Sequence, residues 1–280
     1  QARGWSVAAC ELHDLHWQAE SGVTAQTNII ELIAAQADLA AQNPWFTIKN
    51  TARIALKDFD AVLMRKDPPF DTEYLYATHV LQQAEREGAR VFNRPQALRD
   101  HSEKLALMEF AQFAAPTLVA RDMQALRDFH AQHGDVIFKP LDGMGGAGIF
   151  RVAADGLNLG SVIEQLTQNG TQSIMAQRYL PAITEGDKRV LLIGGQVLPY
   201  ALVRIPQGGE VRGNLAAGGR GVAMELTPQE REIAEFLAPI LYARGLHLVG
   251  LDMIGGYLTE INVTSPTCFV EISEQKGLNV

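Results

Sequence analysis

The sequence contains few cysteines and no long apolar run. Cys10 and Cys268 are its only cysteines, and neither belongs to a paired metal-ligand motif, which argues against a disulfide framework and a cysteine-ligated metal site. Apolar runs such as Val190–Ile193 are far shorter than the roughly 18 residues of a membrane-spanning helix, and no signal-peptide pattern opens the chain. We therefore expect a cytoplasmic protein without membrane association.

Positive charge is also scarce. The 24 Lys and Arg residues face 32 Asp and Glu residues, which gives a formal net charge of -8, and no stretch gathers enough basic residues to bind a phosphate backbone. Nucleic acid is therefore excluded as the expected partner. Hydrophobic residues make up 47% and charged residues 20%, a composition typical of a folded globular protein. The 280 residues suffice for two domains.

The N-terminal third alternates between helical and strand-like segments. Residues 1–4 resemble the end of a helix, and Trp5–Cys10 is predicted to be a buried strand. Val80–Gly88 is typical of a helix that ends in glycine, and Ala89–Asn93 follows as a short strand. The chain has no initiator methionine, so we infer that a preceding strand and most of its helix are missing from a parallel α/β sheet.

A charged loop follows another predicted strand of this region. Phe59–Met64 is a buried-strand pattern, and the segment Arg65–Asp71 collects charges and two prolines directly after it. The carboxyl ends of strands in open α/β sheets are where ligands bind. The alternative is a solvated turn without a binding role.

The pattern changes near residue 100, where we place the domain boundary. The segment Asp100–Glu103 fits an N-cap with a glutamate three residues on, which opens the helix Lys104–Phe113. Strands then come in pairs, which predicts an antiparallel α+β half with one long helix over Pro228–Arg244. The pairs are Asp135–Pro140 with Gly148–Val152, Arg189–Ile193 with Val197–Ile205, and Val249–Ile254 with Tyr257–Val263.

The loop Gly143–Gly148 matches G-x-G-x-x-G, but a strand follows it instead of a helix. That context disfavours a dinucleotide-binding fingerprint, and a Walker A loop is excluded because no Lys-Ser/Thr pair follows. A strand, glycine loop and strand fit a flap over ATP phosphates, with a mobile hairpin tip as the alternative. Lys139 shares a strand face with Ile137 and could neutralise those phosphates. Lys104, taken alone, is typical of a surface lysine.

The last strand pair separates polar from apolar residues by alternation. Asp252, Glu260 and Asn262 share one face if Asp252 pairs with Glu260, which we expect from a three-residue loop Gly255–Tyr257. The opposite face holds apolar side chains, namely Leu251, Met253, Ile261 and Val263. Two carboxylates and an amide oxygen suit Mg²⁺ that bridges ATP phosphates, whereas the alternative is a solvated outer face.

A glycine-rich stretch over Ile205–Gly221 contains two arginines, Arg212 and Arg220. This composition predicts a lid that closes on an anionic substrate, and a disordered linker is the alternative.

These pieces resemble one family, the prokaryotic glutathione synthetases of the ATP-grasp superfamily, over nearly the whole chain. The segments that carry the resemblance are Met64–Asp71, Lys139–Gly146, Gly186–Arg189, Arg212–Gly221 and Thr259–Thr267. The resemblance implies an α/β domain over residues 1–99 that lacks its first strand. It also implies an ATP-grasp fold, with a small lobe over 100–175 and a large lobe over 176–280. From the resemblance we also expect that a C-terminal helix after Val280 is missing from this sequence. Residues 20 to 57 match the family weakly, so Gly22–Ala52 is expected to hold an insertion or flexible loop.

The resemblance also implies an activity and a set of site residues. Glutathione would form from γ-glutamylcysteine, glycine and ATP through an acyl phosphate, with ADP and phosphate as products. Mg²⁺, with Mn²⁺ as a possible substitute, would be the cofactor, and the protein would be a homotetramer. Lys104, Lys139, Gly145, Gly146, Gln177, Tyr179, Leu180 and Asp187 would bind the nucleotide, and Asp252, Glu260 and Asn262 the metal. Arg189 and Arg204 would be catalytic, and Arg65, Arg212, Arg220 and Ser265 would contact the peptide substrate.

Two other functions stay open. A different ATP-grasp carboxylate–amine ligase would share the phosphate and metal residues but not the Arg212–Gly221 stretch. A regulatory protein that binds nucleotide without turnover is the second alternative, and the complete set of Arg189, Asp252, Glu260 and Asn262 argues against it.

Overall fold

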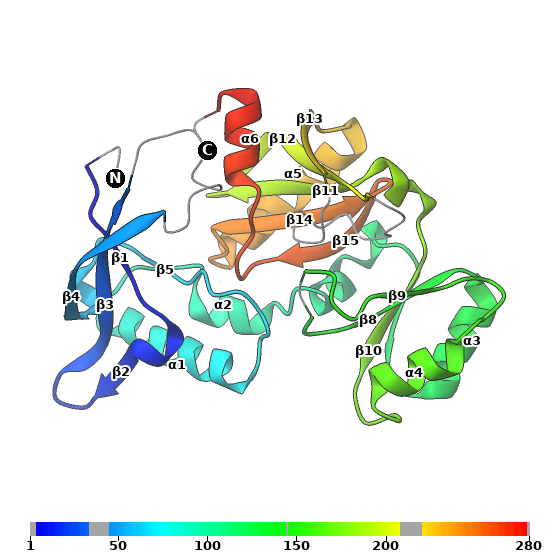
Figure 1. Cartoon of the computed structure of the whole chain (residues 1–280), viewed down its shortest axis with the longest axis horizontal. Helices are drawn as coiled ribbons and strands as arrows, with labels where there is room; N and C mark the ends of the chain where they lie inside the picture. The colour runs from blue at the N-terminus through cyan, green and yellow to red at the C-terminus, as the bar shows by residue number, and fades with distance from the viewer. Residues whose placement is uncertain (1–3, 34–44, 144, 208–219, 279–280) are drawn as a thin grey trace. The chain divides into compact units, whose positions relative to one another are not determined.

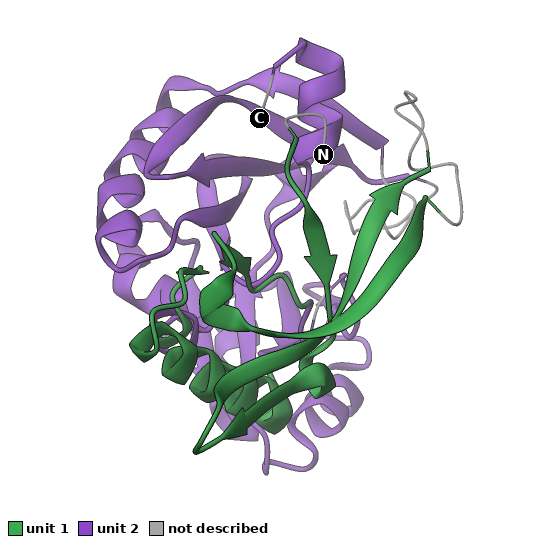
Figure 2. Cartoon of the chain, turned by 90° about the vertical axis from the view of Figure 1, so that its left-hand side faces the viewer, with its two compact units in different colours: residues 1–66, 70–96 green, residues 67–69, 97–280 purple. Residues whose placement is uncertain are grey.

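The computed structural model describes residues 4–33, 45–143, 145–207 and 220–278 of the chain. These residues form two compact units (Figure 2). Unit 1 comprises residues 1–66 and 70–96, and unit 2 comprises residues 67–69 and 97–280. The short segment Asp67–Pro69 therefore belongs to unit 2, although the chain on both sides of it belongs to unit 1.

Unit 1 contains an antiparallel sheet and a small parallel one (Figure 1). In the antiparallel sheet, β3 pairs with β1, β2 and β4, and β5 and β6 form the parallel pair. The helix α1 covers Thr72–Arg86 and begins at Asp71, whose carboxylate accepts a hydrogen bond from the Tyr74 backbone N–H at 2.8 Å. The strands are β1 (Val7–Ala9), β2 (Leu15–Gln18), β3 (Gly22–Leu32), β4 (Phe46–Ala55), β5 (Val62–Leu63) and β6 (Val91–Phe92), and two 3₁₀ turns cover Leu12–Asp14 and Leu56–Asp58.

The structure confirms some predictions for this unit and corrects others. The helix that ends before Gly88 and the strand after it are present, and β5 and β6 are parallel. The strand predicted within Trp5–Cys10 is present as β1, but its predicted burial in a parallel sheet is wrong, because β1 pairs antiparallel with β3 and Trp5 is 69% exposed. The described part of the predicted insertion at Gly22–Ala52 forms most of the two long strands β3 and β4.

Unit 2 contains two antiparallel sheets, and the smaller one has the strand order β7-β10-β8-β9. Its helices α3 and α4 pack on this sheet around a core that includes Leu126, Phe138 and Ile163 (Figure 1). The strands are β7 (Thr117–Ala120), β8 (Val136–Pro140), β9 (Phe150–Val152) and β10 (Ile174–Arg178), and the helices are α3 (Met123–His133) and α4 (Leu159–Thr167). The pairing of β8 with β9 confirms the strand pair predicted around the glycine loop.

The larger sheet of unit 2 has the order β13-β12-β11-β14-β15, and the other two predicted strand pairs lie in it. The long helix α5 begins at Thr227, whose hydroxyl accepts the Glu230 backbone N–H. The helix α6 packs on the same sheet around a core that includes Leu191, Leu202 and Ile272. The elements are β11 (Asp187–Ile193), β12 (Gln196–Ile205), β13 (Arg220–Glu225), β14 (Leu248–Ile254), β15 (Tyr257–Asn262), α5 (Pro228–Ala243), α6 (Phe269–Lys276) and a 3₁₀ turn at Pro181–Glu185.

The region around residue 100 differs from the prediction. A short helix α2 (Pro95–Asp100) precedes a 3₁₀ helix over Leu105–Phe113, so the predicted capped α-helix is wrong. Glu103 does not cap a helix, because its carboxylate accepts hydrogen bonds from Val263 and Thr264 instead. Within the described residues, no helix is long and apolar enough to cross a bilayer.

Candidate active site

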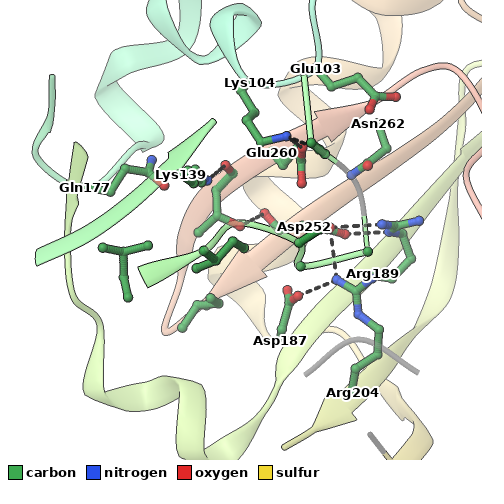
Figure 3. Close-up of a pocket in the computed structure, with 18 of the residues that line it drawn as sticks. Glu103, Lys104, Lys139, Gln177, Asp187, Arg189, Arg204, Asp252, Glu260 and Asn262 are labelled. Atoms are coloured by element: carbon green, nitrogen blue, oxygen red, sulfur yellow. Dashed lines mark hydrogen bonds and ion pairs between the residues drawn. The ribbon is translucent and has the colours of Figure 1, made fainter. Parts of the chain in front are cut away.

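A pocket with a volume of about 330 Å³ lies in unit 2 and is lined by residues of both sheets. Most of the residues to which the family resemblance assigns a role line it (Figure 3). They are Lys104, Lys139, Gly145, Gly146, Gln177, Tyr179, Leu180, Asp187, Arg189, Arg204, Asp252, Glu260, Asn262 and Ser265. The other three are placed differently: Arg65 belongs to unit 1, Arg220 opens β13 and is not among the lining residues, and Arg212 lies outside the described residues, as does most of the predicted lid.

Strand register explains why charged side chains gather on one face of the larger sheet. Directly opposed residues of an antiparallel pair point to the same side. Arg189 lies opposite Asp252, Asp187 opposite Arg204, and Asp252 opposite Glu260. Lys188, one position along β11, points to the other face, where it pairs with Glu230 of α5 at 2.7 Å. Alternation along β11 thus places Asp187 and Arg189 in the pocket and Lys188 on the opposite face of the sheet, against α5.

The pairing of Asp252 with Glu260 arises differently from the prediction. The turn contains two residues, Gly255 and Gly256, with positive φ angles of 56° and 79°, so the predicted three-residue loop is wrong. A β-bulge restores the register, because Thr259 is an extra residue between the pairs Met253–Leu258 and Asp252–Glu260. The predicted face is therefore confirmed, and Thr259 additionally donates its hydroxyl to the Asp252 backbone oxygen at 3.0 Å.

Two arginines surround the buried carboxylate of Asp252 (Figure 3). Arg189 binds it in a bidentate way, with Nε–Oδ1 and Nη2–Oδ2 distances of 2.5 and 2.9 Å. Arg204 bridges Oδ2 of Asp252 at 3.0 Å and Oδ2 of Asp187 at 2.5 Å. Burial disfavours the charged form of Asp252, but the two guanidinium groups outweigh it and hold the pKa of this carboxyl well below its ordinary value.

Two polar atoms in this network have no hydrogen-bond partner among the described residues. They are Oδ1 of Asp187 and Nε of Arg204, both buried. A buried polar atom without a partner costs free energy, and most such atoms in folded proteins are paired. Both side chains line the pocket. One acceptor and one donor are therefore available for a polar ligand.

Asp187 should make stability depend on pH. Burial raises the pKa of its carboxyl to about 6 against the opposing effect of Arg204, compared with an ordinary value of 3.8. Between these two values the folded state binds a proton that the unfolded state has released, so stability falls as the pH rises through this window. The free energy of unfolding of the wild type, compared with that of Asp187→Asn, should therefore fall by at most about 3 kcal/mol as the pH rises from about 4 to about 6. Urea unfolding of both proteins across this range checks it, and parallel pH profiles would contradict it.

Two lysines lie beside Glu260. Nζ of Lys104 is 3.0 Å from Oε1 of Glu260 and donates to the Gly143 backbone oxygen at 2.7 Å. Lys104 is 5% exposed, so its interpretation as a surface residue is wrong. Lys139 is also buried, which lowers the pKa of its ammonium group, although Glu260 opposes this shift. Its Nζ lies 3.5 Å from the Thr259 backbone oxygen, on the bulge itself.

Strand β10 of the smaller sheet and the residue after it bring Gln177 and Tyr179 to the pocket. Gln177 is buried, and its amide donates to the Thr117 hydroxyl at 3.0 Å. The backbone N–H of Tyr179 donates to the Asp135 backbone oxygen at 2.9 Å, and the Arg151 guanidinium lies 3.7 Å from the centre of the Tyr179 ring. Tyr179 is thus positioned by Asp135, directly before β8, and by Arg151 of β9.

Sequence reasoning missed the role of Glu103. Its Oε1 accepts hydrogen bonds from the backbone N–H groups of Val263 and Thr264 at 2.9 and 3.0 Å, and from the Thr264 hydroxyl at 2.7 Å. Its backbone oxygen also accepts the Ile261 N–H. Burial and the neighbouring Glu260 raise the pKa of the Glu103 carboxyl despite these donors. Glu103 therefore fixes the chain directly after Asn262, and no local sequence pattern signals such a contact.

Gly250 is required for the close approach of Arg189. A Cβ at this position would lie 2.7 Å from Cδ of Arg189 and 3.0 Å from Cβ of Pro266. Gly250→Ala should therefore lower the free energy of unfolding by about 1–3 kcal/mol and displace Arg189 from Asp252, which would lower activity. The control is Gly160→Ala in α4, where a Cβ meets nothing within 4 Å. Urea unfolding and ADP release measure both effects, and equal behaviour of the two variants would contradict the packing argument.

The donor set in the pocket fits a divalent cation that has substrate oxygens as further ligands. Asp252 and Glu260 supply carboxylates, and Asn262 donates its amide nitrogen to the Gly250 backbone oxygen at 3.3 Å, which leaves its amide oxygen as an acceptor. Within the described ranges, no group of three or more His, Cys, Asp or Glu side chains could hold a metal without such help. This donor set suits a cation that enters with a phosphate ligand.

Comparison with known proteins decides the family. Residues 1–99 match the N-terminal domain of prokaryotic glutathione synthetase, and residues 103–277 match its ATP-grasp domain. The chain belongs to the prokaryotic glutathione synthetase family. It is 59% identical over 280 residues to the glutathione synthetase of Ralstonia nicotianae, which covers 100% of this chain and 84% of that protein.

One further relative supports the family assignment, and one solved structure supports the ATP-grasp fold. The glutathione synthetase of Neisseria meningitidis serogroup A is 57% identical over 281 residues, covering 99% of this chain and 86% of that protein. The ATP-grasp ligase PsnB, solved with a phosphomimetic variant of its minimal precursor, Mg and ADP, superimposes with a TM-score of 0.55 at 25% identity. That match covers 79% of this chain and 74% of PsnB. The expected ATP-grasp fold and membership of the glutathione synthetase family are thus confirmed.

Proposed function

We propose that this protein joins γ-glutamylcysteine and glycine in an ATP-dependent reaction that yields glutathione, ADP and phosphate. The γ-phosphoryl group of ATP passes to the cysteinyl carboxylate and forms an acyl phosphate. The glycine nitrogen then attacks the acyl carbon, phosphate leaves, and the nitrogen releases a proton. The observation that carries this proposal is the convergence of charged side chains in one pocket of unit 2, in a chain of this family. They include Lys104, Lys139, Arg189, Arg204, Asp187, Asp252 and Glu260.

The charged residues divide the work by position. Lys104 and Lys139, beside the glycine loop, bind the nucleotide phosphates, and Gln177, Tyr179, Leu180 and Asp187 bind the adenosine part. Arg189 and Arg204 stabilise negative charge on the transferring phosphoryl group and on the tetrahedral intermediate. Burial disfavours the charged form of both guanidinium groups, but the neighbouring carboxylates outweigh it and raise the pKa of Arg189 and Arg204. Both arginines therefore stay charged, and neither needs to transfer a proton in this role.

Asp252, Glu260 and Asn262 would hold Mg²⁺, or Mn²⁺ in its place. A cation held there would neutralise phosphate charge and orient the nucleotide. The donor chemistry of these three residues supports this role, as does the presence of Mg and ADP in the PsnB structure. Without a bound cation, ion pairs neutralise the charge of these carboxylates: Glu260 pairs with Lys104, and Asp252 pairs with Arg189 and Arg204.

The remaining predictions concern the substrate and the assembly. Ser265 lines the pocket and would contact γ-glutamylcysteine, together with Arg65, Arg212 and Arg220. We also retain as proposals a homotetramer, a cytoplasmic location, and the division at residues 99 and 175. Small molecules, not nucleic acid, are the partners that this pocket suits.

The experiment is a parallel assay of ADP and glutathione. Purified protein is given ATP, Mg²⁺, γ-glutamylcysteine and glycine, and glycine is replaced in turn by other amines. One glutathione per ADP, with strong preference for glycine, supports the proposal. ADP formed with another acceptor amine, and not with glycine, would identify a different carboxylate–amine ligase, whereas nucleotide binding without any ADP would indicate a regulatory protein.

A further inference from the structure

Asp67 lines the active-site pocket and comes from a short segment that interrupts unit 1 in the sequence. It belongs with Pro68 and Pro69 to unit 2, although the residues on both sides of this segment belong to unit 1. The Ser265 hydroxyl donates a hydrogen bond to Oδ1 of Asp67, and both residues line the pocket. A three-residue excursion of the chain thus delivers one carboxylate to the site.

The partner of Asp67 lies on a segment that is held from two sides. Glu103 accepts the backbone N–H of Thr264 at 3.0 Å, directly before Ser265. Directly after Ser265, Pro266 packs so closely on Gly250 that a Cβ there would be 3.0 Å from it. Ser265 therefore offers Asp67 a fixed point of attachment, and the carboxylate has a defined place in the pocket.

Asp67 differs from the other carboxylates that line the pocket. Asp187 and Asp252 pair with Arg204, Glu260 pairs with Lys104, and Glu103 accepts three hydrogen bonds. Among the described residues, Asp67 forms its hydrogen bond with a neutral hydroxyl, and no ion pair neutralises it. In the part of the chain that the structure describes, Asp67 is thus the pocket carboxylate that has neither a cationic partner nor several donors, which leaves it available to a cationic ligand group.

We propose that Asp67 is the specificity residue that binds the α-ammonium group of the γ-glutamyl moiety, an inference that rests on the proposed function. The glutamyl residue is linked through its side-chain carboxyl, so its α-ammonium group stays free and charged throughout the reaction. A carboxylate is the natural partner of such a group. The glycine nitrogen is a poor candidate, because it must lose its proton before it attacks and an anionic partner would oppose that loss.

The test pairs one substitution with one change in the substrate. Asp67→Asn keeps the size of the side chain and an oxygen that accepts the Ser265 hydroxyl, but it removes the charge. Glutaryl-cysteine has the same chain as γ-glutamylcysteine and lacks the ammonium group. The wild type should prefer γ-glutamylcysteine about 10- to 100-fold in kcat/KM, and Asp67→Asn should lose this preference through a higher KM for γ-glutamylcysteine alone. KM for glycine should not change.

Calorimetric binding of both dipeptides, with ADP and Mg²⁺ present, gives a readout that does not need turnover. The control is Glu274→Gln, which removes one charge from an exposed position in α6 and should retain the wild-type preference. An equal loss for both dipeptides in Asp67→Asn would show a structural role and overturn the inference. A changed KM for glycine with the dipeptide preference intact would overturn it as well. A wild type that binds neither dipeptide would instead refute the proposed function, and with it the ammonium site.

Discussion

Replacement of Glu260 by glutamine is expected to lower the rate of ADP formation by at least about a thousand-fold. Glutamine still accepts a hydrogen bond from Lys104, which lies 3.0 Å away, so the pocket should keep its shape. The lost charge removes an anionic ligand for Mg²⁺ and leaves the buried Lys104 and Lys139 without their nearest neutralising group. The reaction therefore loses its metal site and gains uncompensated positive charge.

Initial rates across a range of Mg²⁺ concentrations measure this effect. The variant should not regain wild-type activity at high Mg²⁺, and its thermal unfolding should show that it is folded. Glu232→Gln, on the exposed side of α5, is the matched control and should behave as the wild type. Unchanged activity of Glu260→Gln at limiting Mg²⁺ would contradict the role assigned to this carboxylate.

The second large effect is expected from Arg189→Met, which should lower the free energy of unfolding by about 3–5 kcal/mol at pH 7. The substitution removes both hydrogen bonds from the guanidinium to Asp252 and leaves a buried carboxylate with Arg204 as its remaining partner. An uncompensated buried charge is costly, whereas an exposed one is not. Arg231→Met is the control, because Arg231 forms an exposed pair with Glu235 at 4.0 Å.

The pH dependence of this difference follows from Asp252. Its folded-state pKa is depressed, so the pair stabilises the protein above the unfolded pKa of about 3.9, and this stabilisation is lost as the pH falls towards the folded value. The difference between wild type and Arg189→Met should therefore shrink below about pH 4. Urea unfolding at pH 7 and at about pH 2.5, which lies inside this window, measures it. An equal difference at both values would show that lost packing, not charge, causes the effect.

Strand alternation predicted much of the site, and its one failure is informative. Period two placed Asp252, Glu260 and Asn262 together, and it placed Lys139 on the face of Ile137 that lines the pocket. The turn was wrong because a glycine pair closes a two-residue hairpin as readily as a longer one, and the bulge at Thr259 then corrects the register. A bulge leaves no local signature in the alternation, since the polar Thr259 fits either face.

Contacts between distant segments could not be predicted. Glu103 fits a helix start by composition, yet it binds residues 160 positions later along the chain. Asp67 and Ser265 are separated by 198 positions, and neither carries a local signal for the other. The burial of Lys104 follows from the same kind of contact with Glu260. In unit 1, the apolar run at Trp5–Cys10 predicted a buried strand, but the strand that forms there is antiparallel to β3 and mostly exposed.

The central claim is that this pocket activates the cysteinyl carboxylate by phosphorylation. The most direct measurement uses γ-glutamylcysteine whose cysteinyl carboxylate carries ¹⁸O in both positions, with unlabelled ATP, glycine and Mg²⁺. The acyl phosphate route transfers one labelled oxygen to phosphate when the glycine nitrogen displaces it. Mass spectrometry of the released phosphate should therefore find one ¹⁸O atom per phosphate and one ¹⁸O in the new amide of glutathione. Unlabelled phosphate alongside labelled glutathione would contradict the account.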